Sequence, residues 1–223
     1  MIHTDAEPTP RKGAISLARR LPAWPIVTHW QRQVCAPADD FLAVLNRRRS
    51  REGGPLDQSN LAALLRHSTM LRERRSDGRF GVWESRAAPA AGGIHALLLL
   101  CLPLDDDNVA GIYDVERHAL LALDSLNEAR LLNRNNVSSI ADAKHGTTLQ
   151  IVADLSRYEA CYDHWESLMW RDAGVLTSII SLVATLLGLV AIPLGRHGND
   201  VVRACHLDTN FIGAGAVHLG ANT

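Results

Sequence analysis

The sequence is poor in cysteine, and its cysteines are not grouped like metal ligands. Only four occur among 223 residues, and no two form a Cys-x-x-Cys pair. They are Cys35, Cys101, Cys161 and Cys205. A structural zinc site needs clustered cysteine and histidine ligands, and His164, His197 and His206 lack helical i, i+4 pairing with a carboxylate. We therefore expect no metal site, and reduced thiols in a cytoplasmic protein.

The sequence also lacks an excess of either charge. Its formal net charge is -1, whereas a general nucleic-acid binder would show a basic excess. Residues 1–13 lack the apolar stretch of a secretory signal, which agrees with the cytoplasmic expectation. Hydrophobic residues make up 47% and charged residues 21%. This composition is globular, and the length suits one domain with a full core.

Only one apolar run is as long as a membrane span, from Val175 to Gly195. A membrane helix is one interpretation. We favour a buried helix that continues into a strand, because Gly188 and Pro193 interrupt the run and small polar residues lie within it. These are Thr177, Ser178, Ser181 and Thr185. No face of the helical part, Val175 to Leu187, is charged, so it needs cover on nearly every side. The run therefore predicts an obligate homodimer with this helix in its interface.

The chain divides into an arm, residues 1–35, and a folded domain, residues 36–223. The arm has one weak helical patch, Ile15 to Leu21, which the following prolines end. A solvated tail and an arm that wraps around a dimer partner both fit this pattern.

The domain shows capped helices, buried strands and a hairpin. Asp40 and Asp57 each precede an apolar periodic segment, as N-caps do. Residues 68–85 are polar and are expected to be irregular. Strands are expected at 96–104, 150–153, 189–194 and 213–219, a hairpin at 109–123, a long helix at 158–187 and a short one at 201–207. This order predicts an α+β fold with a mixed central sheet flanked by helices.

Three segments are candidates for ligand binding. Arg48-Arg49-Ser50 could clamp a phosphate, or could be a solvated helix end that offsets the helix dipole. Pro89-Ala90-Ala91-Gly92-Gly93 would let the backbone approach a flat ring, or could be an ordinary tight turn before a strand. Leu187 to Arg196 is typical of a helix end, a strand and a glycine turn, where the backbone N–H of Gly195 could reach a ligand. The alternative is that these glycines only end a helix and a strand of the core.

The order and spacing of these segments resemble the nitroreductase superfamily. Arg86 to His95, together with Gly111 to Asp114 and the Arg171-Asp172-Ala173-Gly174 segment, is most similar to the SagB-type peptide azoline dehydrogenases. The resemblance extends over roughly residues 41–220. It implies the nitroreductase-like fold and a domain-type homodimer that binds FMN at the subunit interface.

The resemblance also implies roles for particular residues. Arg48 and Ser50 would contact the phosphate and ribityl chain, with Arg49 beside them. The segment Pro89, Ala90, Ala91, Gly92 and Gly93 would line the isoalloxazine ring. The backbone N–H of Gly195, next to Arg196, would lie near flavin N5 and stabilise the reduced flavin.

The sequence departs from the family at several positions. Ala90 and Ala96 replace a serine and a proline, and the C-terminus has no basic residue for the phosphate. The Lys-Tyr pair of azoline dehydrogenases corresponds to Arg157-Tyr158, and arginine cannot act as a base at neutral pH. Tyr158 is therefore the candidate catalytic residue for positioning a proton, with Tyr162 as a second; either could be an ordinary structural tyrosine.

Three functions fit these observations. The first is a SagB-type FMN-dependent dehydrogenase that oxidises an azoline in a peptide or natural product to an azole. The second is an NAD(P)H-dependent nitro or quinone reductase. The third is a degenerate, non-catalytic scaffold in a maturation complex. The expected partners are a second copy of the chain, a small-molecule or peptide substrate and maturation-complex proteins, with neither nucleic acid nor a membrane.

Overall fold

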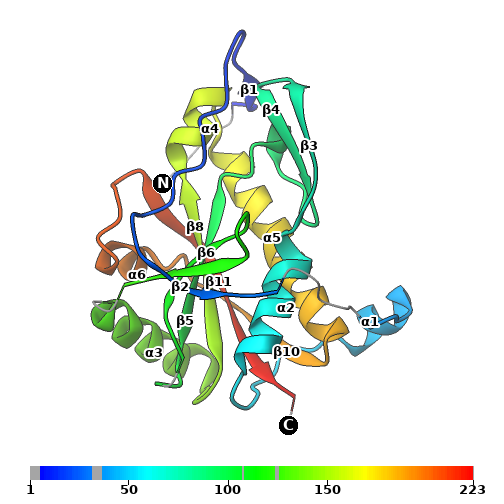
Figure 1. The fold of residues 1–223 in the computed structure, drawn as a ribbon, viewed down its shortest axis with the longest axis vertical. Helices are drawn as coiled ribbons and strands as arrows, with labels where there is room; N and C mark the ends of the chain where they lie inside the picture. The colour runs from blue at the N-terminus through cyan, green and yellow to red at the C-terminus, as the bar shows by residue number, and fades with distance from the viewer. Residues whose placement is uncertain (1–5, 32–36, 107, 124–125, 223) are drawn as a thin grey trace.

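The computed structural model describes residues 6–31, 37–106, 108–123 and 126–222. It is built around one seven-stranded sheet (Figure 1). The sheet has the strand order β10-β11-β8-β5-β6-β7-β2. Its strands are β2 (Ile26–His29), β5 (Leu97–Pro103), β6 (Gly111–Asp114), β7 (Ala119–Ala122), β8 (Thr147–Asp154), β10 (Leu189–Leu194) and β11 (Phe211–Ala221). The helices are α1 (Phe41–Arg47), α2 (Gln58–Thr69), α3 (Asn127–Ala141), α4 (Leu155–Cys161), α5 (Glu166–Leu186) and α6 (Asn199–Ala204), with a 3-10 turn η1 (Ala91–Gly93).

The α+β class is confirmed, but the sheet is antiparallel rather than mixed in every pair of described strands. The connection through α4 and α5 does return β10 in the same direction as β8. However, β11 lies between these two strands and runs antiparallel to both. A strand-helix alternation in the sequence cannot reveal such an insertion by a later strand.

The two acidic N-caps are confirmed. A side-chain oxygen of Asp40 accepts a hydrogen bond from the backbone N–H of Ala43, and Asp57 accepts one from Asn60. Each bond satisfies one of the N–H groups that the first turn of a helix leaves without a partner. α1 and α2 therefore begin where the sequence predicts.

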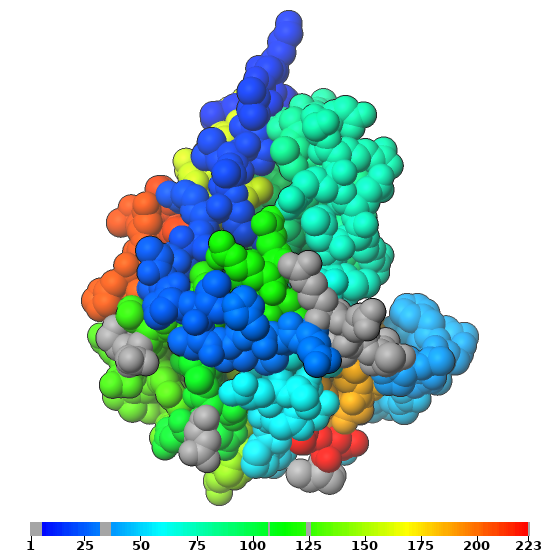
Figure 2. Space-filling view, in the orientation of Figure 1, coloured from blue at the N-terminus to red at the C-terminus, as the bar shows by residue number. Residues whose placement is uncertain are grey.

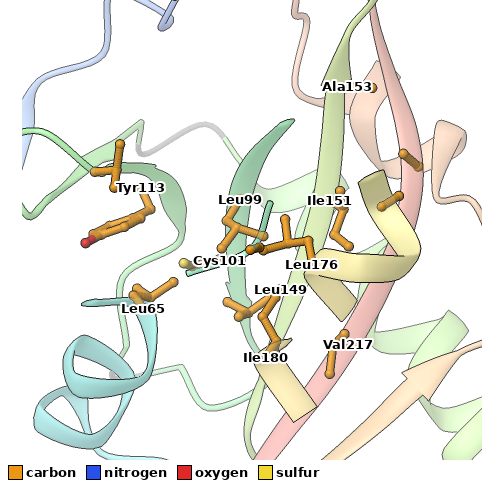
Figure 3. Packing of buried hydrophobic residues seen from close by; sticks show 14 of the residues in the cluster. Leu65, Leu99, Cys101, Tyr113, Leu149, Ile151, Ala153, Leu176, Ile180 and Val217 are labelled. Carbon is orange, nitrogen blue, oxygen red and sulfur yellow. The ribbon is translucent and has the colours of Figure 1, made fainter. Parts of the chain in front are cut away.

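The sheet is covered on both faces, which explains why β5 is continuously apolar. Alternate residues of a strand point to opposite faces. Leu99 and Cys101 lie in the core cluster with residues of α2 and α5, as Figure 3 shows for Leu65 and Leu176. Leu98, Leu100 and Leu102 lie in a second cluster, with residues of α3 and α6.

The long helix α5 packs against β10, β11, α2 and α1. It is long and apolar enough to cross a membrane by length and composition alone, and 39% of its most apolar window is buried in the fold. Leu176, Ile180 and Ala184 are buried on one face. Ile179 and Val183 are only partly buried, so one copy of the chain leaves much of this helix without full cover.

Two secondary-structure expectations are wrong. Residues 68–85, expected to be irregular, end α2 and form the hairpin of β3 (Leu71–Gly78) and β4 (Gly81–Arg86). The charged residues of this hairpin form pairs across the two strands, as Arg74 and Glu84 do. They do not alternate with apolar residues, which is the pattern that predicts a strand. The helix expected over 158–187 is two helices, α4 and α5, separated by the short strand β9 (Tyr162–Asp163). α3 was not predicted, because its apolar stripe is narrow.

The arm lies against its own domain. β1 (Thr9–Pro10) pairs with β9, and β2 pairs with β7 at the edge of the main sheet. Arg20 forms an ion pair with the buried Asp154 at 2.8 Å. The helix expected at Ile15 to Leu21 is wrong: this segment has no regular secondary structure, and the backbone N–H of Ser16 donates to the carbonyl of Phe80 in the domain.

Candidate functional site

The loop before β5, Pro89 to Gly93, is held in its shape by one acidic side chain and by packed rings. The backbone N–H of Ala91 donates to both carboxylate oxygens of Asp172, at 3.0 and 3.2 Å. Gly92 has a φ of 57°, and a Cβ there would lie 2.6 Å from the ring of Phe80. The two-glycine segment is therefore a backbone requirement, because a larger residue meets both conformational strain and a ring.

Asp172 lies in the first half of α5 and also binds Tyr158. The hydroxyl of Tyr158 donates to Oδ2 of Asp172 at 2.9 Å, and the tyrosine ring stacks on Trp165. Burial, and then the neighbouring Asp172, raise the pKa of Tyr158 well above its ordinary value. Tyr158 is completely buried. Its hydroxyl therefore orients Asp172 and, through Asp172, the loop.

His95, at the end of the same loop, has a structural position. Its Nε2 lies 2.9 Å from the carbonyl oxygen of Glu84, and its φ is 44°. Burial, followed by the charge of Arg86, lowers the pKa of His95 to about 4. The imidazole is consequently neutral near pH 7 and joins the loop to β4.

A small cavity lies behind this loop. It has a volume of about 50 Å³, and its wall includes Pro89, Ala90, Tyr113, Asp172 and Leu176. Sites for drug-sized ligands and cofactors are typically several hundred Å³. This cavity is therefore too small for a flavin ring.

Arg48, Arg49 and Ser50 directly follow α1; Arg48 is half-buried, and Arg49 and Ser50 are exposed. Nη1 of Arg48 lies 3.4 Å from the hydroxyl of Ser50, while Arg49 donates to the backbone carbonyl of Asn46 at 2.7 Å. Within the described chain, neither arginine has a carboxylate within ion-pair distance. Two guanidinium groups beside a hydroxyl thus remain available for an anion.

The chain after Ser50 is fixed to the start of the edge strand β10. Gly54 pairs with Ala221, and Ala221 in turn faces Leu189, the first residue of β10. A Cβ on Gly53 would collide with the carbonyl of Ala221 and the side chain of Val190. This close approach of two backbones places the Arg48–Ser50 segment near one end of β10.

Gly195 and Arg196 lie at the other end of β10. Gly195 is exposed, and no atom lies within 4 Å of the position where its Cβ would be. The side chain of Arg196 points inward, with Nη2 3.3 Å from the amide oxygen of Gln150 and 3.4 Å from that of Asn133. Only the backbone at this turn is therefore open to a ligand.

The structure brings the predicted ring-binding residues to one end of the sheet. β10 ends opposite Ala216, in the middle of β11, on the side that faces Phe211. β5 begins opposite Ala153 of β8, which itself faces Ile212 near the first residue of β11. α5 spans both places, since Trp170 packs on His197 at 4.7 Å between ring centroids and Asp172 binds the loop. Arg48 to Ser50 lie at the opposite end of β10, roughly 20 Å away for a six-residue strand.

Sequence reasoning did not assign a role to Asp172, Phe80 or Trp83. A single acidic residue at the start of an apolar helix was a usable signal for Asp172, because a buried carboxylate needs donors. The aromatic residues gave no such signal. In the described part of the chain, no group of three or more histidine, cysteine, aspartate or glutamate side chains is arranged to hold a metal ion.

Comparison with solved structures establishes the fold. No family model matches the sequence, and no curated protein matches it significantly. A protein from Ralstonia eutropha JMP134 described as a nitroreductase superposes with a TM-score of 0.66 at 18% identity, over 98% of this chain and 99% of that one. A nitroreductase from Desulfovibrio desulfuricans crystallised with FMN superposes with a TM-score of 0.54 at 15% identity, over 84% of this chain and 88% of that one. A nitroreductase from Anabaena variabilis ATCC 29413 superposes with a TM-score of 0.55 at 18% identity, over 90% of this chain and 42% of that one. The chain has the nitroreductase fold.

Replacing Asp172 with asparagine will reduce the pH dependence of stability. Burial raises the pKa of Asp172 above its ordinary value of 3.8, although the hydrogen bonds from Ala91 and Tyr158 oppose the shift. The folded state therefore holds this proton more tightly than the unfolded chain. The resulting stability is fully present below about pH 3.8 and is lost as pH rises through the raised pKa. In urea unfolding, the free energy of unfolding of Asp172→Asn should increase relative to that of the wild type as the pH rises from about 4 to 7. A difference between the two proteins that stays constant with pH would contradict this account.

Proposed function

We propose that the protein is an FMN-dependent oxidoreductase that works as a homodimer. The observation that carries the proposal is the glycine loop, Pro89 to Gly93, held by Asp172 at the same end of the sheet as the open backbone of Gly195. This arrangement occurs on the fold of the nitroreductases, of which the Desulfovibrio protein was crystallised with FMN. The cofactor would supply the centre that exchanges hydride.

The residues of this chain fit the cofactor as two groups. Arg48, Arg49 and Ser50 would hold the phosphate, because guanidinium groups without carboxylate partners bind phosphate through charge-assisted hydrogen bonds. The Pro89–Gly93 backbone would lie against the ring. Gly195 would donate its N–H to the ring, where a fixed donor favours the reduced, anionic form.

The finer proposal is a SagB-type dehydrogenase that oxidises an azoline ring, and it rests on the motifs of the sequence. Arg157 is buried at the position of the family's lysine and cannot accept a proton. Tyr158 is likewise buried and bound to Asp172. We therefore assign Tyr158 a positioning role, and we retain an NAD(P)H-dependent nitro or quinone reductase and a non-catalytic scaffold as the alternatives.

The cofactor released from the purified protein tests the proposal. A yellow protein whose released flavin has the mass of FMN supports it. Recovery of FAD would contradict the monophosphate assignment. A colourless protein that binds no added FMN would favour the scaffold. Reduction of the bound flavin without oxygen, by an azoline peptide or by NADH and NADPH in parallel, then separates the dehydrogenase from the reductase.

Replacing Arg48 with alanine will weaken FMN binding without unfolding the protein. Arg48 is half-buried, and its side chain contacts the hydroxyl of the exposed Ser50, so its removal leaves no buried group unpaired. The loss of a charge-assisted bond to phosphate costs about 1.5–3 kcal/mol, or roughly tenfold or more in affinity. The measurement is a flavin titration followed by fluorescence, with Arg203→Ala as the control because Arg203 is an exposed arginine on α6. Equal affinities for the two variants would show that the phosphate lies elsewhere.

A further inference from the structure

A second cavity lies between the N-terminal arm, β4 and α4. Its volume is about 290 Å³, and its wall includes Ser16 to Arg19 of the arm, Val82 and Glu84 of β4, Gly93 and Arg157. It is separate from the small cavity behind the glycine loop, with which it shares only Arg19. The arm thus contributes a basic residue to a cleft of its own domain, which is open to solvent at Leu17 and Val82.

Arg157 in the wall of this cavity is buried without enough hydrogen-bond acceptors. Only 8% of the residue is exposed. Its Nη2 donates to the carbonyl of Ile94, whereas Nε and Nη1 have no hydrogen-bond partner in the described chain. The nearest carboxylate on the same segment, Asp154, already accepts two bonds from Arg20, at 3.2 and 2.8 Å. A buried charge in this state is costly unless an acceptor is supplied.

The acidic side chains beside the cavity are already paired with other arginines. Glu84 accepts hydrogen bonds from Arg74 at 2.5 Å and from Arg86, and Glu116 accepts one from Arg74 at 2.5 Å. Burial opposes ionisation of Glu84, but the charge of Arg86 and the bond from Arg74 lower the pKa of Glu84 to about 2. Both glutamates are therefore anions that are already engaged.

Two positive charges remain in excess. The wall carries the three cations Arg19, Arg74 and Arg157 against the two anions Glu84 and Glu116. Arg86 adds a fourth cation from outside the wall, where it binds Glu84. The described hydrogen bond of the Arg19 side chain is a weak one, 3.4 Å, to the carbonyl of His95. Burial, then Arg86 and Arg157, lower the pKa of Arg19. Because a guanidinium stays protonated in proteins, the cluster remains positive.

We propose that this cavity binds an oxyanion, a carboxylate or phosphate group, through Arg157 and Arg19. Such a group would offset the excess positive charge beside the cavity. Nε and Nη1 of Arg157 are closed off from solvent in the structure, so the guanidinium would turn toward the cavity to donate to the bound oxyanion. Leu17, Ala18 and Val82 give the rest of the wall an apolar surface, so the ligand joins one anionic group to an apolar body. The site does not depend on the proposed flavin chemistry, and a flavin-free protein would retain it.

The test is calorimetric titration of the full-length protein with sodium phosphate and, separately, with sodium benzoate, at constant ionic strength. Wild type should bind at least one of them, and Arg157→Met should weaken that binding at least about tenfold. The control Arg203→Met, at an exposed position of α6, should bind like wild type. Binding of phosphate alone indicates a phosphorylated ligand, and binding of benzoate alone a carboxylic acid.

A second variant and a second titration keep the proposal open to refutation. Arg19→Met changes a partly buried arm residue and should weaken binding even if Arg157→Met folds poorly. A cavity filled only by water gives no binding heat with either anion, which overturns the proposal. Saturation with FMN should leave anion binding unchanged; if FMN abolishes it, the cavity is the cofactor's own phosphate site and the proposal of a separate site is wrong.

Discussion

Replacing Leu42 with aspartate is expected to yield a folded monomer that no longer binds FMN. Leu42 lies on α1, which projects from the side of the molecule beside α5, as the light-blue helix of Figures 1 and 2 shows. Its neighbours Phe41 and Leu45 are also exposed, and the exposed fractions are 63%, 65% and 42% for Phe41, Leu42 and Leu45. Contiguous apolar exposure of this kind marks an interaction surface. Light scattering and flavin titration are the measurements.

The occupant we propose for this surface is a second copy of the chain. α1 packs on α5, whose partly buried Ile179 and Val183 continue the apolar surface. Arg48 follows α1, and one protomer leaves it at the opposite end of β10 from the glycine loop. A partner that covers α1 and α5 would complete the cofactor site, so dimerisation and FMN binding should be lost together.

An exposed leucine elsewhere provides the control for Leu42→Asp. Leu131 on α3 is 59% exposed, and α3 covers the other face of the sheet. Leu131→Asp introduces the same charge in a similar setting and should remain dimeric and yellow. Val183→Asp should behave like Leu42→Asp, with some loss of stability because Val183 is partly buried. A flavin-bound monomer, from wild type or from Leu42→Asp, would refute the shared site.

Local features of the sequence predicted the elements that have local causes. Asp40 and Asp57 begin helices because a short acidic side chain caps the helix within three residues. Buried strands such as β5 and β10 could be read from continuous apolar residues. The hairpin β3–β4 could not be predicted in this way. It is stabilised by cross-strand pairs such as Arg74 with Glu84, and such pairs leave no periodic pattern in the sequence.

The candidate site divides in the same way. The glycine loop and the Gly195 turn were visible as sequence segments, but the contact that joins the loop to α5 links Ala91 to a residue 81 positions away. The inward direction of Arg196, toward Gln150, likewise depends on tertiary packing. Sequence patterns could therefore identify the segments, whereas the roles of Asp172 and Tyr158 follow from the folded geometry alone.

Replacing Gly93 with alanine is expected to destabilise the protein by about 2–5 kcal/mol and to abolish FMN binding. Gly93 has a φ of 68°, which strains any residue with a Cβ, and that Cβ would lie 2.7 Å from Nε1 of Trp83. Gly13 has a similar φ of 72° with no atom within 4 Å, so Gly13→Ala measures the backbone strain alone. The extra loss in Gly93→Ala comes from the ring contact, which must push either the loop or Trp83 aside.

Combining Gly93→Ala with Trp83→Ala removes that contact, and a double-mutant cycle by urea unfolding should recover the extra loss. If Gly93→Ala is no worse than Gly13→Ala and binds FMN normally, the loop does not hold the flavin ring in the way proposed.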